Sequence, residues 1–194
     1  SGSKLRMRSP KNVVDEVEQC VTKFNIRNFL FLADTFTLHR NWTVSVCKDI
    51  VDRGLKINWC ANSRANSIDE EKLRWMKKAG CWLIAFGLES GSQEMLDKMK
   101  KSMKLEDSRR AIQLCRQHGI KSSAYYIFGL PWETRDTADA TIAFAKEINA
   151  NFNKIDARFG EIDARFNAID ARFDGIDAKF ESLESKMDAR FERI

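Results

Sequence analysis

Phenylalanine recurs every seven residues near the C-terminus, and this spacing constrains the fold of its segment more than any other feature of the sequence. The repeated residues are Phe152, Phe159, Phe166, Phe173 and Phe180. An Ile or Leu lies three positions after each of them, which is the pattern of a coiled coil with Phe at a and Ile or Leu at d. One helix cannot bury such a seam by itself. We therefore predict a homo-oligomer formed through Phe152 to Ile194.

The charged residues of this segment agree with the same register. Basic residues fall at the g positions and acidic residues five positions later at the e positions, where they pair between the helices of a parallel coiled coil. Ile at d beside a bulky residue at a favours three or four helices over two, so we expect a trimer or a tetramer. The alternative is an amphipathic helix folded back on its own domain, although such helices usually show a wider and less regular apolar stripe.

The rest of the chain alternates between helix-like and strand-like segments. Continuous apolar runs predict four buried parallel strands, at Asn28 to Ala33, Leu55 to Ala61, Trp82 to Leu88 and Ile120 to Gly129. A helical pattern precedes each run. Ser9 and Pro10 are expected to begin the first helix, and Ser67 and Glu70 to form a capping box at the third. This order predicts an α/β fold, a partial (β/α) barrel with four parallel strands followed by a long C-terminal coiled-coil helix.

Two domains follow from this pattern. Residues 4–149 form the globular domain and residues 150–194 the parallel coiled coil. The last helix of the globular domain is expected to begin near Asp136 and to continue unbroken into the rod, since no Pro or Gly lies between Trp132 and Gly160. Domain and rod are then joined without a flexible linker.

The charge distribution and the cysteines narrow the functional class. The formal charge is +5 overall and −2 in residues 151–194, which leaves +7 for the first 150 residues. Those basic residues are mixed with acidic ones along helical segments, so a solvated surface is favoured over a nucleic-acid site. The five cysteines show no metal-ligand spacing, and their odd number without a signal peptide indicates a reducing, cytoplasmic setting. No apolar run has the length of a membrane span.

Polar residues follow each predicted strand, and the carboxyl ends of parallel strands meet at one edge of a sheet, where ligands bind. The candidate residues, in strand order, are Asp34, Arg64, Glu89, Ser90, Gly129, Pro131 and Glu133. Glu89 and Arg64 are expected on neighbouring strands, where they could meet the amino and carboxylate groups of an amino-acid-like ligand. Taken singly, such residues are also ordinary helix caps and loop ties. Together they favour a ligand-binding rim.

Five segments of the globular part carry a family resemblance. Within residues 8–149 they read RSPKNVVDEVE, FLADTFT, NSRANS, FGLESGSQEMLDKMKK and FGLPWETRDTADATIAFAKEIN. In this order they resemble the radical S-adenosylmethionine (SAM) barrel of the cobalamin-associated branch, which includes the anaerobic magnesium-protoporphyrin cyclase and hopanoid-modifying enzymes. The resemblance implies a parent enzyme that uses a 4Fe-4S cluster, SAM and cobalamin.

The resemblance also implies a place in the SAM site for every strand-end candidate. It places Asp34 near the methionyl amino group and Arg64 in the motif of the family's third strand. Glu89 and Ser90 fall in the motif that touches the methionine and ribose moieties. The turn beside the adenine holds Gly129, Pro131 and Glu133.

The sequence departs from the family at the residues that carry the chemistry. No C-x3-C-x2-C motif, whose thiolates hold the cluster, occurs in the 194 residues, so we expect no cofactor, metal ligand or catalytic residue in this chain. Trp132 replaces a usual Gly and would crowd the adenine turn. The expected function is a catalytically incomplete barrel fragment held in an oligomer by its coiled coil. The alternative is a SAM-binding remnant whose cluster comes from missing segments or a partner.

The edges of the resemblance carry two further expectations. The start Ser1-Gly2-Ser3 and the sharp limits of the match favour a chimera, the middle of a barrel joined to a rod. The first and fourth strands are then open sheet edges, which invite pairing with another chain. We expect copies gathered by the rod, or a docked helix, to cover them. Closure of two four-stranded halves into an eight-stranded barrel is one such outcome.

Overall fold

The structure is a computed structural model that describes residues 7–148, 168–169 and 175. The chain divides into two compact units, residues 1–148 and 149–194. The first unit is an α/β domain that confirms the predicted alternation of helices and strands. In the second unit the described residues Ala168, Ile169 and Gly175 are helical and exposed. The predicted heptad seam and the unbroken helix otherwise lie outside the described residues.

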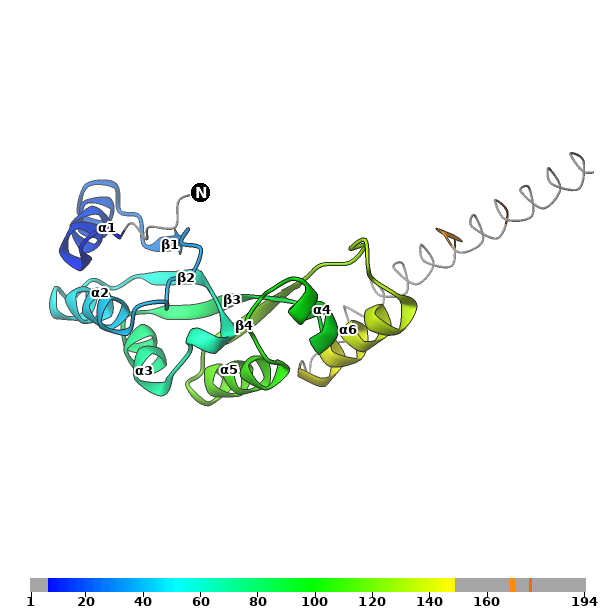
Figure 1. The fold of residues 1–194 in the computed structure, drawn as a ribbon. Helices are drawn as coiled ribbons and strands as arrows, with labels where there is room; N and C mark the ends of the chain where they lie inside the picture. The colour runs from blue at the N-terminus through cyan, green and yellow to red at the C-terminus, as the bar shows by residue number, and fades with distance from the viewer. Residues whose placement is uncertain (1–6, 149–167, 170–174, 176–194) are drawn as a thin grey trace, which may run out of the picture. The chain divides into compact units, whose positions relative to one another are not determined.

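Figure 1 shows the elements of the first unit in chain order. The strands are β1 (Asn28–Phe31), β2 (Asn58–Ser63), β3 (Cys81–Glu89) and β4 (Lys121–Tyr126). The α-helices are α1 (Pro10–Phe24), α2 (Arg40–Asp52), α3 (Glu70–Lys78), α4 (Gln93–Lys98), α5 (Leu105–Gln117) and α6 (Arg135–Ile148). A short 3-10 turn, η1 (Ala65–Ser67), follows β2. Among the described residues no helix has the length and apolarity of a membrane span.

The four strands form one parallel sheet in the order β1-β2-β3-β4, which confirms the predicted sheet. Several strand limits differ from the prediction by one to three residues, among them the end of β4, which is Tyr126 and not Gly129. β1 ends at Phe31, two residues early, because the amide of Ala33 turns back to the carbonyl of Phe31 at 2.9 Å. β2 begins at Asn58, three residues after the predicted Leu55, because the amide of Leu55 still closes the end of α2.

The core lies between the sheet and the helices α2, α3 and α5, which pack along the same side of it (Figure 1). Trp59 is fully buried there, and the rings of Phe31 and Phe36 lie 5.1 and 5.0 Å from its ring. The other side of the sheet is different. Leu30, Leu32 and Tyr125 are 56%, 82% and 58% exposed on β1, just after it and on β4. Among the described residues no helix covers that side, which corresponds to the inner face of a partial barrel.

Capping residues explain where two helices begin. Ser9 accepts a hydrogen bond from the amide of Asn12 and Pro10 takes the first helical position, as predicted for α1. The capping box predicted between Ser67 and Glu70 was wrong. Asp69 is the N-cap of α3 and accepts from the amide of Lys72, because η1 inserts a turn that carries Ser67 away from the helix start.

Arg53 joins α1 to α2 through three carboxylates. Its guanidinium donates to Asp15 at 2.8 Å, to Glu18 at 2.7 Å and to Asp49 at 2.8 Å. The hydrogen bonds that Arg53 donates to these three carboxylates, led by Asp49, raise the pKa of Arg53. Hydrogen bonds from Lys11 and Arg53 lower the pKa of Asp15, which favours its charged form in the folded chain.

Stability should therefore fall at acidic pH in a way that Asp15→Asn removes. A carboxyl group with a lowered pKa in the folded state stabilises the fold above its unfolded pKa, and this contribution is lost as the pH falls below the ordinary value of 3.8. Urea denaturation at pH 7 and pH 3 should show that the wild-type advantage over Asp15→Asn shrinks in acid. Gln19→Ala, an exposed uncharged change on α1, is the control. An advantage that stays constant with pH would contradict the assignment.

Candidate functional site

The carboxyl ends of the four parallel strands form one rim, and the predicted candidates follow them closely. Arg64 comes directly after β2 and Glu89 is the last residue of β3. Asp34 follows β1 by three residues and Gly129 follows β4 by three. The sheet order therefore brings their strand ends to the same edge of the domain, as the sequence predicted.

Arg64 and Glu89 are connected through Lys101, in the loop between α4 and α5. Nη2 of Arg64 donates to the backbone carbonyl of Lys101 at 2.5 Å. The ammonium of Lys101 in turn pairs with the carboxylate of Glu89. Nε of Arg64 is buried and has no partner in the described part of the chain. The rim thus holds two cations and one carboxylate in a series of contacts that runs from Arg64 through Lys101 to Glu89, and Nε of Arg64 lacks an acceptor among the described residues.

The backbone around this group is held in uncommon conformations. Glu89 has φ +66°, and Lys100 and Ser102 on either side of Lys101 have φ +53° and +49°. Such left-handed conformations cost non-glycine residues on the order of 1 kcal/mol each and cluster at functional sites. Gly87 makes this conformation of the Glu89 side chain possible, since a Cβ added at position 87 would lie 2.5 Å from Oε1 of Glu89. The carboxylate therefore lies back over the strand, beside Lys101.

Ser90 acts in this structure as a tie between β3 and α6. The residue is 1% exposed, and its hydroxyl bonds to the hydroxyl of Thr141 at 2.9 Å and accepts from the amide of Ser92 at 3.1 Å. The amide of Gly91 also donates to Thr141, at 3.0 Å. An added Cβ on Gly91 would lie 2.5 Å from Cβ of Phe144, so α6 packs directly on this turn. Ser90 thereby fixes the strand end that carries Glu89.

The turn after β4 is held by Glu133. One carboxylate oxygen accepts from the amide of Gly129, and the amide of Glu133 donates to the carbonyl of Leu130 at 2.9 Å. Gly129 has φ +85°, which favours glycine, and the space around its Cα is open. The other oxygen of Glu133 is buried without a partner among the described residues. Pro131 is exposed, and it follows the open Gly129 turn.

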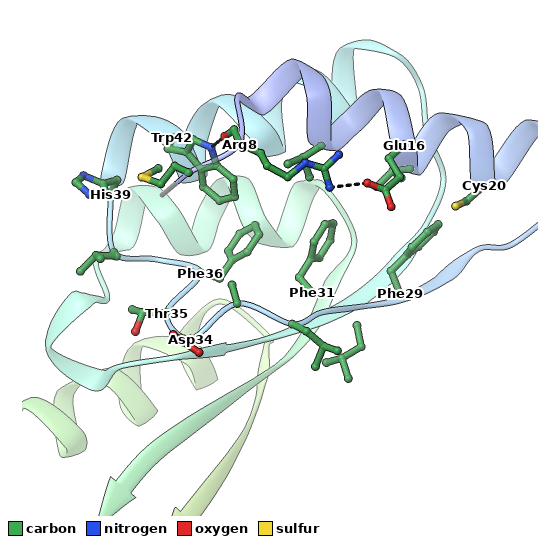
Figure 2. A pocket seen from close by; sticks show the side chains of 17 residues that line it. Arg8, Glu16, Cys20, Phe29, Phe31, Asp34, Thr35, Phe36, His39 and Trp42 are labelled. Atoms are coloured by element: carbon green, nitrogen blue, oxygen red, sulfur yellow. Dashed lines mark hydrogen bonds and ion pairs between the residues drawn. The ribbon is translucent and has the colours of Figure 1, made fainter. Parts of the chain in front are cut away.

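Asp34 and Arg64 line different hollows. Asp34 is exposed on the wall of a groove of about 760 Å³ between α1 and β1, which we call the β1 groove (Figure 2). Arg64 lines a second hollow of about 460 Å³ with Ser67, Asp69 and Lys72. Lys72 is buried there, and its ammonium bonds to the carbonyl of Ser67 at 2.6 Å and to Asp69 at 3.1 Å. The structure therefore connects Arg64 to Glu89 through Lys101, whereas Asp34 lines the β1 groove and not the hollow of Arg64.

Lys101 and Thr141 are the site residues that sequence reasoning missed. Lys101 lies in a lysine-rich run, in which nothing distinguishes the one lysine that turns toward Glu89. Thr141 lies in the middle of α6, where a threonine reads as an ordinary helix residue. The structural signal for the role of Lys101 is the positive φ of the residues on either side of it, and the residue types at those positions do not predict a positive φ.

The described thiols do not fit an iron-sulfur cluster. Cys47, Cys81 and Cys115 are buried, and burial raises the pKa of Cys81 and of Cys115 to about 12. Burial also raises the pKa of Cys47. The metal ligand is the thiolate, which these environments disfavour. Cys81 moreover begins β3, at the end of the strand opposite the rim. Among the described residues no group of three or more His, Cys, Asp and Glu side chains could hold a metal ion.

The rim fits the polar groups of SAM better. A methionyl carboxylate would supply the acceptor that Nε of Arg64 lacks. A methionyl ammonium needs a carboxylate, and Glu89 is 16% exposed at the same rim. The open turn at Gly129 leaves backbone accessible for a flat, hydrogen-bonding group such as a purine.

Parallel strands with helices on one side and polar carboxyl ends define a protein of the (β/α)-barrel class. Within that class the comparison with known families is specific: the Radical SAM superfamily matches residues 1–145. The chain belongs to this superfamily.

Curated relatives agree with the match. The anaerobic magnesium-protoporphyrin IX monomethyl ester cyclase of Rubrivivax gelatinosus is 35% identical over 146 residues, which cover 74% of this chain and 26% of the cyclase. An uncharacterized methyltransferase of Pyrococcus horikoshii is 32% identical over 151 residues, which cover 78% of this chain and 33% of that protein. The chain thus spans about a quarter to a third of these relatives.

Solved structures show the same fold. The radical SAM methyltransferase TsrM of Kitasatospora setae, with cobalamin and a 4Fe-4S cluster bound, superposes with a TM-score of 0.70 at 23% identity, over 76% of this chain and 30% of TsrM. The cobalamin-dependent SAM radical enzyme OxsB gives a TM-score of 0.63 at 22% identity, over 72% of this chain and 22% of OxsB. Together with the cyclase, these proteins confirm the predicted resemblance to the cobalamin-associated branch.

Proposed function

We propose that residues 7–148 form the SAM-holding rim of a radical SAM barrel, that residues 152–194 gather copies into an oligomer, and that the 194-residue chain does not cleave SAM by itself. The observation that carries the first part is the group of Arg64, Lys101 and Glu89. It presents a buried free donor of Arg64 beside a carboxylate, at the strand ends where this superfamily's barrel class binds ligands.

Each residue of the rim has a binding or positioning task in this proposal. Arg64 takes the carboxylate of SAM through its guanidinium. Glu89 takes the ammonium group, which replaces that of Lys101 as its partner. The turn at Gly129, held by Glu133, lies beside the adenine. Ser90 positions Glu89 by linking the end of β3 to α6. In this proposal it has no direct contact with SAM.

The absence of turnover is proposed on the chemistry of the thiols. In this superfamily the cluster supplies the electron that cleaves SAM. The five cysteines have no C-x3-C-x2-C spacing, and the buried thiols favour their protonated form at the far end of a strand or within helices. A second candidate function is a SAM-binding part of an enzyme whose cluster comes from another segment or a partner. It is favoured by the short span of the match, 26% of the Rubrivivax cyclase.

The oligomer is proposed from the heptad seam. Phe at a and Ile or Leu at d over five repeats need neighbouring helices to bury them. Ile169, at a d position, is 47% exposed in the single chain. A charge pattern with bases at g and acids at e favours parallel chains.

Two measurements on the full chain test these parts separately. Light scattering should give three or four times the 22.4 kDa of one chain, and Phe166→Asp with Phe173→Asp should lower that mass. Equilibrium dialysis should show one SAM bound per chain. After reconstitution with iron and sulfide, no stoichiometric cluster and no 5′-deoxyadenosine are expected. A native particle of 22.4 kDa would refute the oligomer. A stoichiometric cluster with SAM cleavage by the purified chain would refute the absence of turnover.

A further inference from the structure

Three side-chain hydroxyl groups meet next to the turn that carries Arg64. They belong to Thr37, in the loop after β1, to Ser63, the last residue of β2, and to Ser67, the last residue of η1. Thr37 and Ser63 are buried, with 0% and 3% of each residue exposed. The hydroxyl of Thr37 bonds to that of Ser63 and lies 2.5 Å from that of Ser67. Segments up to 30 residues apart in the sequence are thus joined at one point.

The direction of these hydrogen bonds follows from the number of protons, because each hydroxyl has only one to donate. Ser67 donates its proton to the backbone carbonyl of Arg64 at 2.7 Å. Thr37 is therefore the donor to Ser67, and Ser63 is in turn the donor to Thr37. The three groups form one ordered series, which we call the hydroxyl series. It starts at Ser63 and ends at the carbonyl of Arg64.

Arg64 is thereby held at both of its ends. Its carbonyl accepts from the hydroxyl of Ser67 and, at 3.1 Å, from the amide of the same residue. Its guanidinium donates to the carbonyl of Lys101 at 2.5 Å. Nε lies between these two points and is the atom that lacks an acceptor among the described residues. A long side chain that is ordered before a ligand arrives loses less conformational entropy on binding.

Two further contacts hold η1, on which the hydroxyl series ends. The ammonium of the buried Lys72 donates to the carbonyl of Ser67 at 2.6 Å. The side-chain amide of Asn66 donates to the carbonyl of Ser102 at 3.1 Å, in the loop that also contains Lys101. The hydroxyl of Ser67 therefore belongs to a turn whose backbone is fixed on two sides.

The loop after β1 supplies the central hydroxyl of the series. Asp34 and Phe36 of this loop line the β1 groove (Figure 2), and Thr37 follows them at a buried position. The amide of Phe36 donates to the carbonyl of Asn62 at 3.0 Å, which brings the loop to the end of β2. Thr37 thus connects the loop that carries Asp34 to the turn that carries Arg64.

Packing alone does not require hydroxyl groups at this point. Apolar side chains of similar size would fill the same space, and a buried polar group that loses its partner destabilises the fold. A buried polar network whose members are all paired has a different property, since it fixes one arrangement of the segments that it joins. The segment fixed here is the backbone of Arg64.

We propose that Thr37 is a positioning residue of the rim. Through the hydroxyl series it fixes the backbone of Arg64, so that Nε presents its N–H to an anionic group of the ligand in one orientation. The inference rests on the proposed function in one respect, namely that the ligand is SAM and the anionic group its carboxylate. It goes beyond that function because the loop after β1, and not only the rim itself, then sets the affinity for the ligand.

Equilibrium dialysis of the full chain with labelled SAM tests the role of Thr37. Thr37→Val keeps the shape and removes the hydroxyl, and should weaken SAM binding about 3- to 10-fold, as expected for one hydrogen bond of ordinary strength. Thr37→Ser keeps the hydroxyl and should restore most of the affinity. Thr22→Val is the matched control. It removes an exposed hydroxyl that donates to the carbonyl of Glu18 within α1, and it should bind SAM as wild type does.

A double-mutant cycle with Arg64→Met separates positioning from a general loss of structure. Because Thr37 acts through Arg64, Thr37→Val should have no further effect on SAM binding in the Arg64→Met chain. A merely structural role predicts the same loss in both backgrounds. That result, or wild-type affinity of a folded Thr37→Val chain, would overturn the inference and leave the proposed rim standing. If Thr37→Val does not fold, Ser67→Ala replaces it in the cycle, since it removes the last hydroxyl of the series.

A measurement without SAM keeps this inference apart from the proposed function. In the nitrogen-15 NMR spectrum of the arginine Nε–H groups, the signal of Arg64 is identified by its loss in Arg64→Met. It should shift or broaden in Thr37→Val and stay in place in Thr22→Val. A wild-type chain that binds no SAM would refute the proposed rim. An Arg64 signal that Thr37→Val leaves unchanged would overturn the positioning, whereas a changed signal would support it even then.

Discussion

Replacing Arg64 with Met is expected to weaken SAM binding about 10- to 100-fold, because a hydrogen bond to a charged group contributes about 1.5–3 kcal/mol. Nε of Arg64 is buried without a partner in the described part of the chain, so a bound carboxylate supplies its missing acceptor. Met keeps the aliphatic stem of the side chain and removes all of its donors. Equilibrium dialysis of the full chain with labelled SAM measures the change.

Two control variants separate binding from folding. Arg64→Lys keeps the charge but loses the planar fork, so its affinity should lie between those of wild type and Arg64→Met. Arg110→Met removes an exposed arginine, whose nearest carboxylate, on Asp107, is 3.8 Å away, and should bind as wild type does. Because Arg64 also holds the carbonyl of Lys101, each variant must match the wild-type melting temperature. A folded Arg64→Met chain with wild-type affinity would refute the proposed rim.

The sequence predicted this part of the site because the change from apolar to polar residues marks where each strand ends. Apolar runs locate the strands, and the polar residues that follow the runs lie at the rim, which placed Arg64 and Glu89 at the ends of neighbouring strands. What the sequence does not encode locally is the course of each loop. The amide of Phe36 bonds to the carbonyl of Asn62 at 3.0 Å, which directs the segment after β1 over β2 and leaves Asp34 on the groove side. Lys101 likewise reaches Glu89 because of the course of the loop between α4 and α5, which the local sequence does not predict.

The order of helices and strands could be predicted from the sequence, but the register between neighbouring strands could be predicted less well. Trp59 and Trp82 both stand in short apolar runs and look alike in the sequence. In the structure Trp59 is fully buried and Trp82 is 46% exposed. A bulge causes the difference: Trp59 is paired with Cys81 and Cys60 with Leu83, so Trp82 is an extra residue without a partner on β2. Alternation along β3 restarts after it, and no local pattern marks that restart.

Trp59→Ala is accordingly expected to lower the free energy of unfolding by about 3–5 kcal/mol, a large part of the 5–15 kcal/mol typical of a domain. The indole packs against both Phe31 and Phe36, which also contact each other, and it donates to the carbonyl of Ala79 at 2.7 Å. Truncation leaves a cavity under the sheet and an unpaired buried acceptor. Urea denaturation followed by circular dichroism of the backbone measures the loss.

Trp82→Ala is the matched control, the same change one strand away at the exposed bulge position. It should cost clearly less than Trp59→Ala, because Trp82 is already 46% exposed whereas Trp59 is fully buried. Trp59→Phe should fall between the two: it keeps an aromatic ring against Phe31 but loses the N–H that satisfies Ala79. Equal losses for Trp59→Ala and Trp82→Ala would mean that the bulge is absent and that the two rings share the core. The register of β2 on β3, and with it the placement of Arg64 and Glu89 at neighbouring strand ends, would then be wrong.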